Sequence, residues 1–135
     1  MFDFKYLLDT SICVELLRGN EKVRKHCIEH DQQCSISIIT AIELLYGAYH
    51  ASEKYRNQEL SKAKMLIDYY GVVGIDNIAQ SFCQEKVRLE RQGLIIEDFD
   101  LLIGMTAKVN GMIVVTNNSK HFNRIDELKI ENWTE

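Results

Sequence analysis

The stretch KYLLDTSICVELLRG, residues 5–19, passes directly from an apolar run typical of a β-strand to a pattern typical of a helix. Asp9, Thr10 and Ser11 lie at the junction, where a side-chain oxygen can cap the helix. A carboxylate at this point either caps the helix or faces a ligand in solution. The choice between these two roles decides most of the functional interpretation.

Short apolar runs and helical patterns alternate along the rest of the chain. Helices are predicted at residues 11–18, 21–31, 41–51, 53–70, 78–92 and 99–110. Strands are predicted at residues 4–8, 34–39, 72–75 and 112–116, with a weaker candidate at 128–133. Helical crossovers between successive strands favour parallel pairing. We therefore expect an α/β fold, with one domain over residues 1–135 and a central parallel sheet of four to five strands flanked by helices.

Composition narrows the class of protein. The 135 residues carry a net charge of −4, which argues against a module that coats nucleic acid through unspecific charge. The four cysteines form no C-x-x-C pair, and we predict that they are reduced thiols in a cytosol. No apolar run approaches the ~18 residues of a membrane span. We expect a soluble, unprocessed cytoplasmic protein that does not enter a membrane.

Three acids follow or precede the predicted strands in a regular way. Asp9 ends the first strand, Glu43 follows the second by a few residues, and Asp100 begins the helix that leads into the fourth. In a parallel sheet these positions share the edge formed by the carboxyl ends of the strands, where ligands bind. Three carboxylates in one cleft repel one another unless a cation neutralises them, and all-oxygen ligands suit Mg²⁺ or Mn²⁺.

A purely structural interpretation of the same acids is available. Acids in the first turn of a helix interact favourably with its dipole. Thr40 and Glu43 have the spacing of a capping box, and Asp98 is a plausible N-cap. Taken singly, each of the three acids is more often structural than functional.

Four blocks of the sequence, YLLDTSICVELLRG, SIITAIELLYGA, EDFDLLIGMTA and MIVVTNNSKHFNRI with LKIENW, resemble in order and register the signature blocks of PIN-domain ribonucleases. The resemblance is closest to the VapC-type toxins of bacterial type II toxin–antitoxin pairs. The blocks extend from Tyr6 to Trp133, whereas residues 50–92 match only in helical character.

The resemblance implies that Asp9, Glu43 and Asp100 bind a catalytic Mg²⁺ or Mn²⁺ ion. Such an ion lowers the pKa of a bound water and stabilises charge on the scissile phosphate. Residues that would orient water or the ligands are Thr10, Ser11, Asp98, Thr116 and Asn118. Many PIN domains carry a fourth acid where this chain has Asn118, so a second metal would be weakly held here. Position 11 is often asparagine in relatives, and the hydroxyl of Ser11 can still donate to a neighbouring carboxylate.

The resemblance also implies an RNA substrate, an antitoxin partner that obstructs the acidic cleft, and a homodimer. Basic side chains that would hold the RNA backbone are Arg18, Lys86, Arg88, Arg91, Lys120 and Arg124, and we expect two or three of them at most to touch RNA. Leu44, Leu45 and tyrosines form an aromatic cluster that either packs in the core or makes an interface. Its tyrosines are Tyr46, Tyr49, Tyr55, Tyr69 and Tyr70.

Other functions stay open from the residues alone. The same acids would suit a metal-dependent phosphohydrolase of small molecules, although aspartate phosphatases need a second aspartate where this chain has Ser11. A non-catalytic α/β binding module is the third possibility. His26 and His30, four residues apart beside Cys27, could suggest zinc, but we interpret them as a solvated helix face. Cys13 and Arg18 lack the spacing of a phosphatase thiolate loop.

Overall fold

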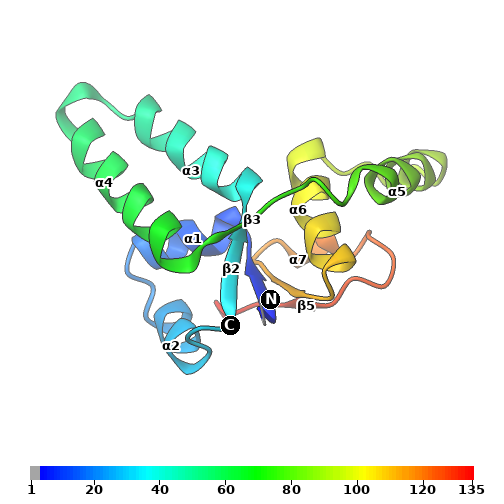
Figure 1. Cartoon of the computed structure of the whole chain (residues 1–135), viewed down its shortest axis with the longest axis horizontal. Coiled ribbons are helices and arrows are strands. Elements are labelled where there is room, and N and C mark those ends of the chain that lie inside the picture. The colour runs from blue at the N-terminus through cyan, green and yellow to red at the C-terminus, as the bar shows by residue number, and fades with distance from the viewer. Residues whose placement is uncertain (1–3) are drawn as a thin grey trace.

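Five short parallel strands form the centre of the computed structural model, which describes residues 4–135 (Figure 1). They are β1 (Tyr6–Leu8), β2 (Cys34–Ser37), β3 (Val72–Val73), β4 (Ile113–Val115) and β5 (Ile130–Glu131). Their order in the sheet is β3-β2-β1-β4-β5, and each neighbouring pair is parallel. The predicted parallel sheet is confirmed, and the weak candidate near the C-terminus is its fifth strand.

Helices connect the strands as crossovers. They are α1 (Thr10–Leu17), α2 (Glu21–Glu29), α3 (Ile38–His50), α4 (Glu53–Tyr70), α5 (Ala79–Arg91), α6 (Asp98–Val109) and α7 (Ser119–Phe122). The first six match the predicted helices, and α4 has the predicted bounds. The four-residue helix α7 was not predicted because it is too short to show a periodic apolar pattern.

Each face of the sheet is covered by its own set of helices. Tyr6 and Leu8 point to one face, where they pack with side chains of α1 to α4 and with Trp133. Leu7 points to the other face and packs against α5, α6 and α7. Figure 1 shows the α3–α4 hairpin reaching out on one side of the sheet and α5 on the other. Both faces are buried, as expected for a parallel sheet with helical crossovers.

The starts of α3 and α6 bear on two predicted caps. Helix α3 begins at Ile38 because the Ser37 hydroxyl accepts a hydrogen bond from the Ile39 amide at 3.0 Å, so the strand ends before the two isoleucines. Thr40 therefore lies inside the helix and cannot form a capping box with Glu43. Asp98 is the first residue of α6, and its predicted role as N-cap is wrong because Glu97 occupies that position.

The strand ends align at one edge of the sheet. Leu8, the last residue of β1, pairs with Ile36 of β2 and with Val115 of β4. Asp9 and Thr116 follow these strands directly, and α3 begins two residues after Ile36. The carboxyl edge thus collects the segments that carry the predicted site. We refer to it as the acid edge.

Two further sequence features are visible in the structure. Cys13, Cys27 and Cys34 are buried thiols, Cys83 is exposed, and each is free. Among helices within residues 4–135, none combines the length and apolar character needed to cross a bilayer.

Candidate metal centre

Asp9 has two roles at the acid edge. It is the N-cap of α1, where its Oδ1 accepts from the Ile12 amide at 2.9 Å and from the Ser11 hydroxyl at 2.6 Å. Its side chain is only 4% exposed. Burial raises the pKa of Asp9 from 3.8 to about 6, against the lowering effect of hydrogen bonds from Ser11, Thr116 and Ile12. The charge of Asp100 raises this pKa further. The two roles weighed for this carboxylate, as cap and as ligand, are therefore compatible.

Glu43 reaches the same edge from α3. Its Oε1 accepts a hydrogen bond from the Thr10 hydroxyl at 2.6 Å, and that hydroxyl also lies 3.1 Å from the hydroxyl of Thr40. Thr10 directly follows Asp9, so this bond joins the start of α1 to the first turns of α3. The second oxygen of Glu43 keeps its lone pairs for another ligand.

Asp100 completes the group from the first turn of α6, where it is half-buried. Burial raises its pKa, and the negative charges of Glu43 and Glu97 raise it further. His121 of α7 lowers it. Asp9 interacts with Asp100, and Asp100 interacts with Glu43, so the structure brings the three predicted acids into one electrostatic group.

The charge balance of this group fits a divalent cation. The ion pairs within residues 4–135 use Glu59, Glu85 and Asp98, so no lysine or arginine neutralises the three acids. Asp9, Glu43 and Asp100 do not bring ligand atoms within 4.8 Å of one another in the described chain, where His26, Glu29 and His30 alone do so. A hard cation that retains several waters accepts such spacing, because not every acid must bind it directly.

Hydroxyl and amide groups surround Asp9 as the sequence suggested. The Ser11 hydroxyl that donates to Asp9 also accepts from the Asn117 amide at 3.3 Å. Thr116 hydrogen-bonds Asp9, and its hydroxyl accepts from the Asn118 amide at 2.8 Å. These contacts fix the junctions after β1 and β4 relative to each other.

Comparison with known proteins identifies the fold family. The sequence profile of the PIN domain matches residues 6–128. The chain is 32% identical over 132 residues to the tRNA(fMet)-specific endonuclease VapC of Shigella flexneri, covering 96% of this chain and 98% of that protein. This chain belongs to the VapC family of PIN domains. The Ribonuclease VapC2 of Rickettsia felis is 33% identical over 132 residues, covering 95% and 97% of the two chains.

A solved structure supports the same assignment. The crystal structure of DNA-bound VapBC from Salmonella typhimurium contains a chain with a TM-score of 0.90 and 30% identity, covering 96% of this chain and 98% of that one. Nucleases of the VapC family generally depend on a divalent metal ion. The single domain over residues 1–135 stays a prediction, since the profile spans 6–128.

Asn118 and Asp98 differ from Asp9, Glu43 and Asp100 in their contacts. Asn118 takes the place of the fourth acid predicted from the VapC resemblance, and its Nδ2 lies 3.0 Å from Nδ1 of His121. Asp98 forms an ion pair with Lys86 at 2.7 Å, and both side chains are exposed. Asp98 is not among the charges that act on Asp100, so it stands apart from the acid group.

Three of the six predicted RNA-binding cations are engaged inside the protein. Besides Lys86, Arg88 binds the buried Glu85 through two hydrogen bonds of 2.7 and 2.8 Å and donates to the Arg124 carbonyl. Arg124 donates to the Ile95 carbonyl at 2.6 Å. These contacts hold α5 to the segment after α7. In the described chain, Arg18, Arg91 and Lys120 have exposed side chains without such a partner.

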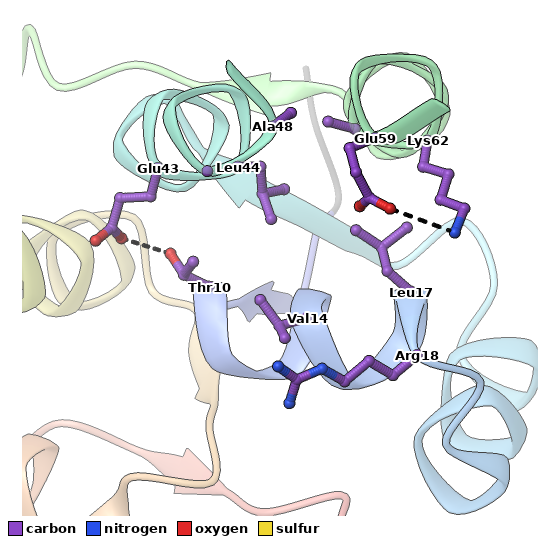
Figure 2. Close-up of a pocket in the computed structure, with 11 residues that line it drawn as sticks. Thr10, Val14, Leu17, Arg18, Glu43, Leu44, Ala48, Glu59 and Lys62 are labelled. Atoms are coloured by element: carbon purple, nitrogen blue, oxygen red, sulfur yellow. Dashed lines mark hydrogen bonds and ion pairs between the residues drawn. The ribbon is translucent and has the colours of Figure 1, made fainter. Parts of the chain in front are cut away.

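A groove of about 530 Å³ runs from the acid edge between α1, α3 and α4 (Figure 2). The hydrogen-bonded pair Thr10 and Glu43 lies at one end, and the ion pair Glu59 and Lys62 lies at the other. Arg18 lines the groove from α1. The groove therefore extends from Glu43 to the basic side chain of Arg18 and is lined in between by apolar side chains.

Sequence reasoning missed two charged members of the site, His121 and Glu97. Both act on the pKa of Asp100. The order of the elements along the chain could have indicated both residues. The chain leaves β4 at the acid edge and forms α7 there, and Glu97 is the N-cap residue of the helix that carries Asp100.

The predicted aromatic cluster divides between surface and core. Tyr46, Tyr49, Tyr55 and Tyr69 are more than half exposed. Tyr70 is half-buried and hydrogen-bonded to Cys27, and Leu44 is buried. All four lie on the α3–α4 hairpin, and Tyr69 donates a hydrogen bond to Asp31 at 2.6 Å. The other three are available for a partner.

Proposed function

We propose that this chain is the toxin of a type II toxin–antitoxin pair, an endoribonuclease that hydrolyses phosphodiester bonds of RNA with a divalent metal ion. The observation that carries the proposal is the group Asp9, Glu43 and Asp100. These acids lie at the carboxyl edge of a parallel sheet, and no lysine or arginine forms an ion pair with them in the described residues. The chain's VapC relatives are named as endonucleases and ribonucleases.

The three acids would hold Mg²⁺, with Mn²⁺ as a substitute, because their ligands are oxygens. When bound, the ion would supply a nucleophilic water at neutral pH and stabilise charge on the phosphate. Ser11 and Ile12 keep one oxygen of Asp9 occupied and thereby orient the other. Thr10 orients Glu43 in the same way. His121, which acts on the pKa of Asp100, would donate to a phosphate oxygen or leaving group.

Transfer RNA is the substrate class we propose to test first, because two relatives at 32% identity are named tRNA(fMet)-specific endonucleases. Arg18 lines the groove that begins at Glu43, and Lys120 lies on α7 next to His121. Both would bind backbone phosphates on either side of the cleaved bond. Arg88 and Arg124 would contribute less because they are held by protein groups.

The partners follow from the same family. Solved structures similar to this chain are VapBC complexes, so we propose a cognate antitoxin that covers the acid edge, and a homodimer that acts in the cytoplasm. The exposed Tyr46, Tyr49 and Tyr55 supply an aromatic surface of the kind enriched at interfaces. A small neighbouring gene for a DNA-binding protein that relieves growth arrest would support the pairing.

The decisive experiment compares RNA cleavage by the full chain and by Asp100→Asn, with Mg²⁺ and with chelator. We expect cleavage by the wild type only with the metal, and a loss of at least ~10³-fold in the variant. Asp68→Asn is the matched control, because Asp68 is an exposed aspartate of α4 outside the site. Cleavage by Asp100→Asn at the wild-type rate would overturn the assignment.

Two further measurements, turnover of a generic phosphate ester and stabilisation by metal, separate the alternatives. Turnover of a generic phosphate ester without RNA cleavage would indicate a small-molecule phosphohydrolase. Absence of any metal-dependent stabilisation or turnover would indicate a binding module. A ribonuclease should cleave RNA and leave the ester intact.

A further inference from the structure

A second group of ligand-type side chains lies away from the acid edge, at the end of α2. His26, Glu29 and His30 place one ligand atom each within 4.8 Å of one another. The group lies at the start of the strands, because His30 packs against Tyr6, the first residue of β1, whereas Asp9 follows the last. The interpretation of His26 and His30 as a solvated face is wrong, since both imidazoles are half-buried.

Both imidazoles pack on a single buried indole. The ring centroids of His26 and His30 lie 5.2 and 5.3 Å from that of Trp133, at interplanar angles of 16° and 21°. Trp133 is 1% exposed. The two imidazole planes differ by 6° and their centroids are 6.5 Å apart. Rings on opposite faces of the indole would be about 7 Å apart or more, twice the ~3.5 Å contact distance. The imidazoles therefore lie side by side on the same face.

This arrangement matches the needs of a shared metal ion. A metal bound to an imidazole nitrogen lies in the plane of the ring, so two rings that lie side by side with nearly parallel planes can share one ion. With Zn–N bonds of about 2.0–2.1 Å and a tetrahedral angle between them, two imidazoles that share an ion have centroids roughly 5–5.5 Å apart. The observed separation of 6.5 Å is about 1 Å greater, so the two rings must approach each other slightly when the ion binds. Packing against Trp133 limits the rotation of both rings, which prepares them for binding.

The ligand atoms are free to bind. Within residues 4–135, no hydrogen bond or ion pair engages a ring nitrogen of His26 or His30, or the carboxylate of Glu29. His30 is the C-cap of α2, where a positive ion is also favoured by the helix dipole. The spacing His-x-x-Glu-His on a helix is one that zinc proteins use.

We propose that His26, Glu29 and His30 bind one transition-metal ion, Zn²⁺ by preference, with water completing the shell. Two imidazole nitrogens and one carboxylate oxygen are a zinc ligand set, whereas Mg²⁺ prefers oxygen ligands alone. This site is independent of RNA cleavage, since its ligands and the acids lie at opposite ends of the strands. Binding would hold the last turn of α2 against the indole of Trp133.

Trp133 gives the test a local signal because it is the only tryptophan of the chain. The full-length protein is titrated with Cu²⁺ in excess Mg²⁺, which occupies the acid edge, and tryptophan fluorescence is recorded. We expect one-site quenching that an excess of Zn²⁺ reverses by competition, because Cu²⁺ binds nitrogen and oxygen ligands more tightly than Zn²⁺ does. The double variant His26→Gln with His30→Gln should bind at least ~10-fold more weakly, and Glu29→Gln, an exposed position, about 10-fold more weakly.

His50→Gln is the matched control, since His50 is an exposed histidine near the end of α3 that is not part of the group. Its titration should equal that of the wild type. Circular dichroism checks the fold of each variant. If the double variant does not fold, the comparison of Glu29→Gln with the wild type provides the test. The proposal is overturned if Glu29→Gln and the wild type give the same curve, or if Zn²⁺ in large excess over Cu²⁺ leaves the quenching unchanged.

Discussion

The two ends of the strands carry ligand groups of opposite chemistry. At the carboxyl end, three acids offer hard oxygens and repel one another. At the amino end, two imidazoles stack on an indole beside one exposed acid, and the three groups carry little mutual repulsion. Without a cation, the negative charges of the first group repel one another. The second group needs no metal to keep its arrangement, because its two imidazoles pack on the indole. A site made of acids is therefore recognised by the energetic cost of its charges, and a site made of histidines by the geometry of its rings.

The largest effect expected at the acid end is loss of cleavage in Asp9→Asn. The amide oxygen can still accept from the Ile12 amide and the Ser11 hydroxyl, so the cap of α1 is retained. The negative charge is lost, and cleavage of RNA should fall by at least ~10³-fold, about 4 kcal/mol in transition-state stabilisation. Single-turnover assays measure the loss. A variant that retains cleavage would remove Asp9 from the metal centre.

At the other end, Trp133→Ala should lower the free energy of unfolding by roughly 3 kcal/mol, because it leaves a cavity beside Tyr6 and the two imidazoles. Urea denaturation measures this change. Trp133→Phe should cost less because a ring remains to pack on them. Equal stability of the alanine variant and the wild type would show that the indole does not organise this end of the sheet.

The raised pKa of Asp9 makes the stability of the metal-free protein depend on pH. Asp9 has a pKa of 3.8 when unfolded and about 6 when folded, so the folded state binds the proton more tightly. Stability of the metal-free protein should therefore fall, relative to Asp9→Asn, as pH rises from about 4 to about 7. The loss approaches about 3 kcal/mol, at about 1.36 kcal/mol per pH unit.

Denaturation at several pH values, with chelator and with Mg²⁺, measures this difference. Asp9→Asn should be the more stable protein at neutral pH without metal, and Mg²⁺ should narrow the gap. A gap that does not change with pH would mean that burial does not penalise the charge of Asp9.

The smallest effect is expected for Asp98→Asn. The exposed ion pair with Lys86 contributes little in water, so stability should change by less than ~1 kcal/mol. RNA cleavage should remain within about threefold of the wild type, because Asp98 does not act on the acid group. A large loss in the same cleavage assay would move Asp98 into the metal centre, as the sequence had suggested.

The features that the sequence predicted well are local. The junction at Asp9 was visible because strand, cap and helix follow one another within a few residues. Helix α4 was predicted with its bounds because Gly71 ends it at φ 73°, a conformation that favours glycine. The acid edge followed from these local elements and the parallel sheet alone.

Features that depend on long-range contacts were not predictable from the same patterns. Ile38 and Ile39 have the residue type of a strand, yet the Ser37 cap places them in α3. Arg88 was predicted to be free to bind RNA, but in the structure it is engaged by Glu85 and by the segment after α7. Trp133 meets His26 across more than 100 positions of the chain, and no local pattern encodes that contact.

Asp9 is both the N-cap of α1 and a member of the acid group, and this double role restricts which substitutions evolution can accept at position 9. A descendant that abandoned RNA cleavage would still need an oxygen acceptor for the Ile12 amide to start α1. Substitutions to asparagine or serine would then be accepted at position 9, because both supply an acceptor oxygen. Selection would remove an apolar residue there, because the chain would misfold without the cap.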